Sequence, residues 1–105
     1  MRSICLVAVD DKLRPALVLT ADGKREHALR VTVAPISSTI RGSNTELLVG
    51  PAEGLDHESA VKCEILLTVP AAAVVREIGL LPSDREAELR QAIVVAFDLL
   101  PLAIA

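Results

Sequence analysis

Two short polar segments contain the side chains best suited to chemistry on a phosphate group. Arg14 directly precedes the aliphatic residues 15–19. If these residues form a buried strand, the strand would hold the Arg14 guanidinium in a fixed position at its end. Ser37, Ser38 and Thr39 follow another apolar run, and Arg41 comes two residues later. Hydroxyls, backbone N–H groups and arginine all bind phosphate oxygens. A strand-end arginine and a solvated turn are the ordinary structural alternatives for these two segments.

Other familiar catalytic arrangements are missing from the sequence. It has no G-x-S-x-G turn, no phosphate-binding glycine loop, no H-E-x-x-H and no acidic cluster suited to two-metal chemistry. His57 could act as a general base beside Asp56 and Glu58, or could be a solvated loop histidine. Cys5 and Cys63 lack metal-site spacing and lie in apolar runs, so we expect two buried, reduced thiols. No metal ion or other cofactor is therefore expected.

Charge is unevenly distributed along the chain. The net charge of −3 argues mildly against a general nucleic-acid binder, because nonspecific phosphate binding usually needs a basic surface. Residues 1–42, however, hold seven Lys/Arg against four Asp/Glu, whereas residues 43–105 hold four against ten. The first part is where an RNA site would lie. With 51% hydrophobic residues and a single aromatic, Phe97, the core must be aliphatic.

Apolar runs and turn residues predict six strands followed by one helix. The expected strands cover residues 3–9, 15–20, 29–35, 45–49, 60–69 and 74–79. Residues 21–27 and 37–44 are expected to be loops. Ser83-Asp84-Arg85-Glu86 has the pattern of a capping box. In the helix that follows, an apolar face would pack on the sheet while three charged residues face water, and Pro101 would end it; the face comprises Leu89, Ala92, Ile93, Ala96, Phe97 and Leu100, and the charged residues are Arg85, Glu88 and Arg90.

This order of elements predicts a mainly β, α+β fold, in which a small barrel or strongly curved sheet packs against a terminal helix. At 105 residues the chain is expected to be one domain, residues 1–105. Its apolar stretches are too short to span a membrane, and its start lacks the pattern of a secretory signal. We therefore expect a cytoplasmic protein.

The two polar segments belong to a longer ordered series of motifs. R-P-A-L-V-L at residues 14–19 is followed by V-A-P-I-S-S at 33–38, R-G at 41–42 and T-E at 45–46. The series continues with Gly54-Leu55-Asp56, Ser59-Ala60-Val61, Ile78-Gly79 and a helix that ends in Phe97-Asp98-Leu99. This series resembles the MazF/PemK family of toxins, and most closely a short actinobacterial-type branch whose first loop is trimmed.

The resemblance implies a fold, an activity and a set of partners. It implies an SH3-like barrel of the CcdB/MazF type that forms a homodimer and is neutralised by a MazE-like antitoxin. It also implies a metal-independent, sequence-selective endoribonuclease, in which the 2′-hydroxyl of single-stranded RNA or mRNA attacks the adjacent phosphate. The products would be a cyclic phosphate and a 5′-hydroxyl. The family's catalytic residues fall on Arg14 and Ser37, and we expect Lys12, Ser38, Thr39 and Arg41 to contact phosphate.

Two further functions remain possible at this stage. One is a catalytically weakened family member that mainly binds an antitoxin-like peptide. The other is a CcdB-like gyrase inhibitor, which is disfavoured because such proteins depend on C-terminal aromatic and charged residues, whereas this chain ends Leu-Pro-Leu-Ala-Ile-Ala. The apolar composition also predicts a homodimer, with residues 99–105 as part of the contact.

Overall fold

A tight hairpin opens the chain and positions the first candidate site residues. The computed structural model describes residues 1–99, and its first two strands are β1 (Arg2–Val9) and β2 (Lys12–Val18). Asp10 and Asp11 connect them, with φ of 49° and 63°. Positive φ at both central residues is the geometry of a type I′ turn, which matches the twist of antiparallel strands. This turn lies in the gap between the expected strands 3–9 and 15–20.

Five more strands and two α-helices follow. They are α1 (Asp22–Arg25), β3 (Arg30–Ser37), β4 (Glu46–Val49), β5 (Ser59–Lys62), β6 (Leu67–Pro70), β7 (Val74–Leu81) and α2 (Glu86–Phe97). Short 3-10 turns lie at Pro51–Glu53, Ala71–Ala73 and Ser83–Arg85. The segment 21–27, expected to be a loop, therefore contains the one-turn helix α1.

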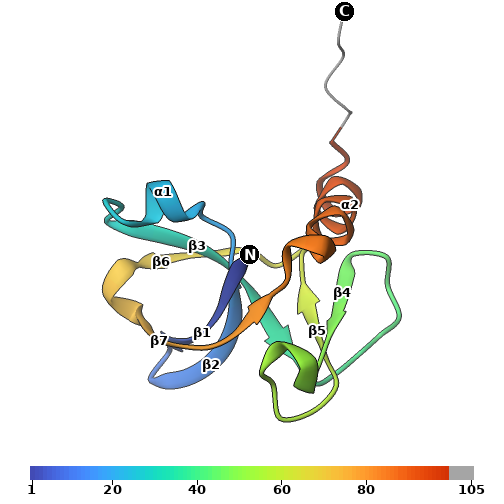
Figure 1. The fold of residues 1–105 in the computed structure, drawn as a ribbon, viewed down its shortest axis with the longest axis horizontal. Helices are drawn as coiled ribbons and strands as arrows, with labels where there is room; N and C mark the ends of the chain where they lie inside the picture. The colour runs from blue at the N-terminus through green and yellow to red at the C-terminus, as the bar shows by residue number, and fades with distance from the viewer. Residues whose placement is uncertain (100–105) are drawn as a thin grey trace, which may run out of the picture.

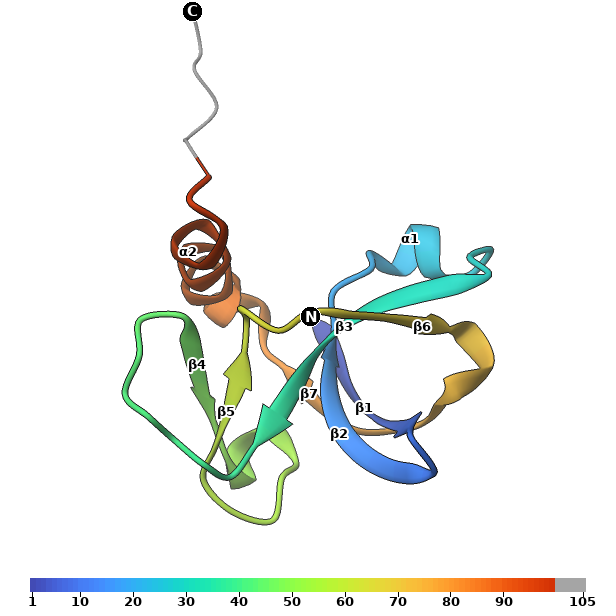
Figure 2. The ribbon, with the colours of Figure 1, turned by 180° about the vertical axis from the view of Figure 1, so that it is seen from behind.

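The strands form one strongly curled sheet, as predicted. Its order is β4-β5-β3-β2-β1-β7, and β6 pairs with the first half of β3. β1, β2, β6 and β7 curl into a half-barrel on one side of β3, whereas β4, β5 and α2 lie on the other side (Figures 1 and 2). β3 is thus the central strand, and its C-terminal end, where Ser37 lies, reaches β5.

The expected single strand over residues 60–69 is wrong, because the chain breaks there into β5 and β6. Val33 lies opposite Leu67 in β6, and Ile36 lies opposite Val61 in β5. Three steps along β3 therefore match six along its partner, so three residues are looped out between the two strands. The Ile65 N–H donates to the Lys62 carbonyl and closes this turn. A register shift of this kind leaves no mark in an apolar sequence pattern.

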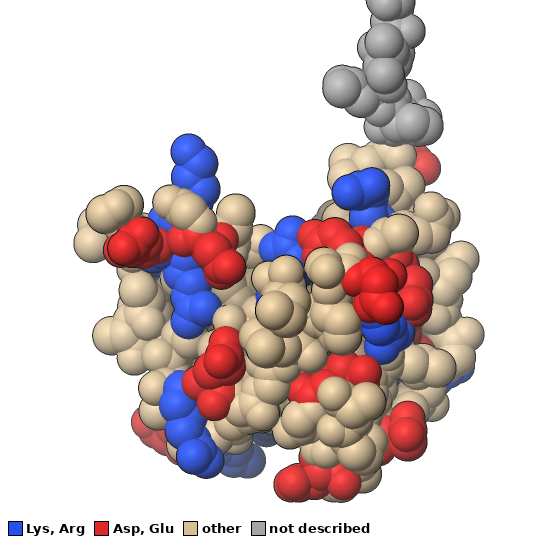
Figure 3. All heavy atoms as spheres, in the orientation of Figure 1, with Lys and Arg blue, Asp and Glu red and all other residues tan. Residues whose placement is uncertain are grey.

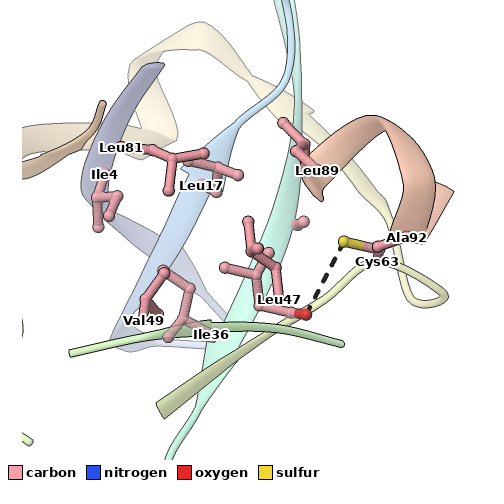
Figure 4. Close-up of a cluster of buried hydrophobic side chains, with 11 residues drawn as sticks. Ile4, Leu17, Ile36, Leu47, Val49, Cys63, Leu81, Leu89 and Ala92 are labelled. Atoms are coloured by element: carbon pink, nitrogen blue, oxygen red, sulfur yellow. Dashed lines mark hydrogen bonds between the residues drawn. The ribbon is translucent and has the colours of Figure 1, made fainter. Parts of the chain in front are cut away.

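The core is aliphatic and lies on both faces of the curled sheet. One cluster fills the half-barrel, with side chains from β1, β2, β3 and β6: Cys5, Val7, Ala16, Val18, Val31, Val33 and Val69. The other lies between the sheet and α2 and includes Ile4, Leu17, Leu47, Leu81, Leu89 and Ala92 (Figure 4). Cys63 joins this second cluster, and both cysteines are buried and free, as expected.

Helix α2 departs from the expected pattern at both ends. No side chain caps its N-terminus, since a 3-10 turn occupies Ser83–Arg85, and Glu86 instead accepts hydrogen bonds from Arg2. Arg85 does not face water: its side chain is 23% exposed and pairs with Glu88 and Glu53. An ion pair between elements has therefore replaced the expected capping box.

The helix also ends earlier than Pro101 would require. Phe97 is its last residue, and Asp98 takes a left-handed conformation with φ of 50°. Leu89 and Ala92 are buried as predicted, whereas Phe97 is 45% exposed and is not one of the buried core residues that it was expected to join. Leu100 and Pro101 lie outside the described residues.

Candidate active site

Arg14 and Ser37 lie on neighbouring strands and face the same side of the sheet. β2 and β3 are antiparallel, and their ladder ends at the pair of Ala16 and Pro35. Arg14 lies two residues before Ala16 and Ser37 two residues after Pro35, so each lies just beyond this last pair. Side chains alternate between faces along a strand, so both point to the same face as Ala16 and Pro35. Two residues 23 positions apart in the sequence therefore lie on one face at the end of the β2–β3 ladder.

The hairpin adds a second cation to the same face. Lys12 begins β2, pairs with Val9 across the turn, and lies two residues before Arg14. Both side chains are exposed, at the end of a strand whose other half is buried. The buried half anchors the strand, and the exposed half carries two positive charges on the same face of the sheet as Ser37.

The segment between β3 and β4, residues 38–45, is called the site loop below. Its first turn is fixed by Ser37, whose Oγ accepts a hydrogen bond from the Thr39 N–H at 3.1 Å. This contact uses an acceptor position of the hydroxyl and leaves its O–H free to donate. Thr39, Arg41 and Ser38 are all exposed. The loop thus supplies polar groups close to the end of β3.

An open pocket of about 330 Å³ joins the end of β3 to the site loop and to the turn after β5. Its lining residues are Pro35, Ser37, Thr39, Arg41, Lys62, Glu64 and Ile65. Three sequence-predicted residues, Ser37, Thr39 and Arg41, are thus brought together. Arg14 and Lys12 lie on the adjoining strand and not in this lining, and Ser38 is exposed outside it.

Lys62, Glu64 and Ile65 are pocket residues that the motif analysis did not select. The looped-out residues between β5 and β6 place Glu64 and Ile65 at the rim. Lys62 differs from ordinary surface lysines because its side chain is only 9% exposed. A lysine inside the apolar run Ala60–Cys63 was the available signal, because a buried cation needs an acceptor.

Histidine chemistry is separate from this pocket. His57 is exposed, as the loop interpretation predicted, and lines a different pocket with Asp56, Arg76 and Leu6. Within residues 1–99, no three His, Cys, Asp or Glu side chains come together in a way that could hold a metal ion. The chemistry available at the candidate site is therefore that of guanidinium, ammonium, hydroxyl and one rim carboxylate.

Charge is mixed over the molecular surface. Figure 3 shows acidic and basic side chains interspersed over the face that it presents. The candidate site takes Lys12, Arg14 and Arg41 from the basic first part of the chain. Lys62, from the acidic second part, is paired with Glu46, and Glu64 also lines the pocket. The positive charge of the site therefore comes from the first part of the chain, although the net charge of the protein is −3. In the described part of the chain, no helix is both long and apolar enough to cross a bilayer.

Comparison with known proteins shows which family the chain belongs to. The family model described as PemK-like, MazF-like toxin of type II toxin-antitoxin system matches residues 3–97 of this chain. The chain is 44% identical over 93 residues to endoribonuclease MazF3 of Mycobacterium tuberculosis, covering 89% of this chain and 90% of that protein. It is 33% identical over 86 residues to the probable endoribonuclease MazF5 of the same organism, covering 81% and 79%. The solved structure of the M. tuberculosis toxin MazF-mt6 matches with a TM-score of 0.90 and 43% identity, over 93% of this chain and 98% of that one. This chain therefore belongs to the PemK/MazF family of toxins of type II toxin–antitoxin systems.

Proposed function

We propose that this MazF-type endoribonuclease cleaves single-stranded RNA without a metal ion, and that Arg14 and Ser37 act on the reacting phosphate. The observation that supports the proposal is the β2–β3 register, which ends at Ala16 and Pro35 and leaves Arg14, which is exposed, and Ser37, which is half-buried, just beyond that pair on the same face. A phosphodiester lying across the end of these two strands would meet both groups at once.

Arg14 is suited to stabilising charge and not to transferring protons. An arginine side chain offers five N–H donors in a planar fork and no acceptor. When the ribose 2′-hydroxyl attacks the adjacent phosphorus, negative charge builds on the non-bridging oxygens, and a positioned cation lowers that barrier. The 5′-oxygen leaves as the new bond forms, which gives a 2′,3′-cyclic phosphate and a 5′-hydroxyl. The rigid strand beneath Arg14 supplies the positioning.

Ser37 would donate its free O–H to a phosphate oxygen. Because the Thr39 N–H already occupies an acceptor position of the hydroxyl, the oxygen is held in place and its proton points elsewhere. A neutral donor of this kind contributes less than a charged one. We therefore assign Ser37 a smaller share of the rate than Arg14.

The remaining candidate residues bind the RNA backbone. Arg41 and Thr39 line the pocket beside Ser37 and would contact the phosphate next to the scissile one. Lys12 lies two residues before Arg14 and would contact a phosphate on its other side. Ser38 is exposed on the site loop, between Ser37 and Thr39, and would add a hydroxyl contact to the RNA backbone. Such contacts hold the strand in register without taking part in bond cleavage.

The family membership implies a cognate antitoxin, and we propose a MazE-like one that acts in the cytoplasm. We also propose a homodimer. Large apolar side chains remain exposed in the edge strand β4, in α2 and just after it, among them Leu48 at 52%, Phe97 at 45% and Leu99 at 51%. Exposed apolar surface of this kind marks interfaces. Sedimentation at micromolar concentration should give twice 11.1 kDa, and a monomer alone would contradict the dimer.

The activity is tested with purified protein, a long single-stranded RNA and excess EDTA. Cleavage should persist in chelator, and the products should carry cyclic phosphate and 5′-hydroxyl ends. Ser37→Ala should slow single-turnover cleavage by about tenfold, the effect of losing one neutral hydrogen bond. Cleavage that requires added Mg²⁺, or products with 5′-phosphate ends, would overturn the mechanism.

A further inference from the structure

The site loop is held in shape by one buried ion pair. The Glu46 side chain is 1% exposed and the Lys62 side chain 9%, and the two form a salt bridge between β4 and β5. Glu46 also accepts hydrogen bonds from the backbone N–H of Arg41, at 3.1 Å, and of Ser43, at 3.0 Å. Lys62 Nζ donates to the Thr39 carbonyl at 2.7 Å. The two side chains thus form hydrogen bonds with the loop backbone at three residues, Thr39, Arg41 and Ser43.

From these contacts we propose that Glu46 and Lys62 are positioning residues for RNA binding, which fix the site loop so that Thr39 and Arg41 face the pocket beside Ser37. The inference rests on the proposed function, because it assigns the loop to RNA contact. It adds Glu46 and Lys62 to the residues that act in RNA cleavage. Both contact the backbone of the site loop, and neither needs to contact the reacting atoms.

The arrangement is better explained by loop shape than by fold stability. A buried ion pair loses much solvation energy, and well-packed apolar residues of similar volume often support a fold equally well. Here every side-chain hydrogen bond that Glu46 and Lys62 make outside their own pair goes to the site-loop backbone. The other anchors of the loop lie at its two ends, where the Thr39 N–H donates to Ser37 Oγ and the Cys63 N–H donates to the Thr45 carbonyl. Between these ends, Ile40 is 42% exposed, so the loop has no buried apolar side chain there.

The geometry also explains why these contacts would affect binding more than turnover. Arg14 and Ser37 lie on the regular strands β2 and β3, which pair with each other independently of the loop. Thr39 and Arg41 lie on the loop and owe their positions to Lys62 and Glu46. Loosening the loop would therefore weaken RNA binding while leaving the catalytic pair in place.

The decisive variant is the double substitution Glu46→Leu/Lys62→Met, which keeps the interior apolar and removes all contacts to the loop. It should raise KM for RNA by about tenfold or more and leave kcat within about threefold. This pattern is expected when a substitution weakens binding of the substrate and of the transition state equally. Limited trypsin digestion gives a second readout, since Arg41–Gly42 lies within the loop. Cleavage there should accelerate by about tenfold, because local opening controls proteolysis, while cleavage after Lys24 stays unchanged.

The matched control is Arg2→Met/Glu86→Leu, which makes the same substitutions in a pair that touches no residue of the site loop. It should leave KM and cleavage after Arg41 at parental values. If the decisive variant fails to fold, Glu46→Gln is measured instead, and it should shift KM and proteolysis in the same direction by a smaller factor. Parental KM with parental proteolysis at Arg41, or a fall in kcat with KM unchanged, would overturn the inference. The proteolysis measurement does not depend on RNA cleavage. A parent protein that cleaves no RNA would therefore contradict the proposed function, while the rate of trypsin cleavage after Arg41 would still test whether the ion pair holds the loop.

Discussion

Of the single substitutions at the candidate site, the one that removes the Lys62 amine should lower the free energy of unfolding most. In Lys62→Met the Glu46 carboxylate would keep its two backbone N–H donors but lose its counter-ion, at a side-chain exposure of 1%. Breaking a buried pair by removing one partner typically costs about 3–5 kcal/mol. The double variant Glu46→Leu/Lys62→Met leaves no buried charge and should lie within about 2 kcal/mol of the parent.

The pH dependence of this effect follows from the pKa of Glu46. The hydrogen bond from Lys62 is the main cause that lowers this pKa from 4.5 to about 2. A depressed pKa contributes stability that is complete above pH 4.5 and is lost as the pH falls toward 2. Without the amine, Glu46 binds its proton at higher pH. The stability gap between parent and Lys62→Met should therefore be widest at neutral pH and shrink below about pH 4.5.

Urea unfolding, followed by circular dichroism from neutral pH to about pH 4, measures both the gap and its pH trend. A gap below about 1 kcal/mol at neutral pH would mean that the pair is solvated and worth no more than a surface salt bridge. A gap that widens toward acid would show that Glu46 is not the group responsible. Either result would refute the reasoning.

Three other predictions concern packing, thiol chemistry and RNA binding. Gly79→Ala should destabilise the fold by about 1–3 kcal/mol in urea, because its Cβ would lie 1.8 Å from the Glu53 carbonyl oxygen. Gly23→Ala, with nothing within 4 Å of the new Cβ, should change stability by less than about 1 kcal/mol. The Cys63 thiol, whose pKa burial raises to about 11, should stay unalkylated by iodoacetamide in the folded protein, as read by peptide mass mapping. Lys12→Ala and Arg41→Ala should each reduce the slope of log affinity against log salt by about 0.7 while keeping kcat; an unchanged slope would remove that residue from the phosphate contacts.

The fold was predictable from the sequence where local pattern decides it. Alternating and apolar runs gave five of the strand positions, and the gap between the first two expected strands contains the hairpin turn at Asp10 and Asp11. Residues 60–69 were mispredicted because both β5 and β6 are apolar, and only the partner strand reveals the three looped-out residues. The helix start was also missed, since Arg2 at the other end of the chain draws Glu86 away from a capping role.

The candidate site was predictable only in part. Residue types drew attention to Arg14 and to the hydroxyls after residue 36, but sequence spacing cannot show that Arg14 and Ser37 share a face, because that depends on register across 23 residues. The family resemblance supplied the pairing, and the structure supplies its geometry. Lys62 was missed because a charged residue in an apolar run reveals its partner only in three dimensions.

The central claim is that Arg14 stabilises the transition state from the end of β2, and one variant tests it most directly. Single-turnover cleavage of a single-stranded RNA in EDTA should fall by about 100- to 1000-fold in Arg14→Ala, as expected on losing one preorganised donor of roughly 3–4 kcal/mol. The melting curve should shift by no more than about 1 kcal/mol of unfolding free energy, because the Arg14 side chain is exposed. A folded Arg14→Ala protein that cleaves RNA as fast as the parent would contradict the account.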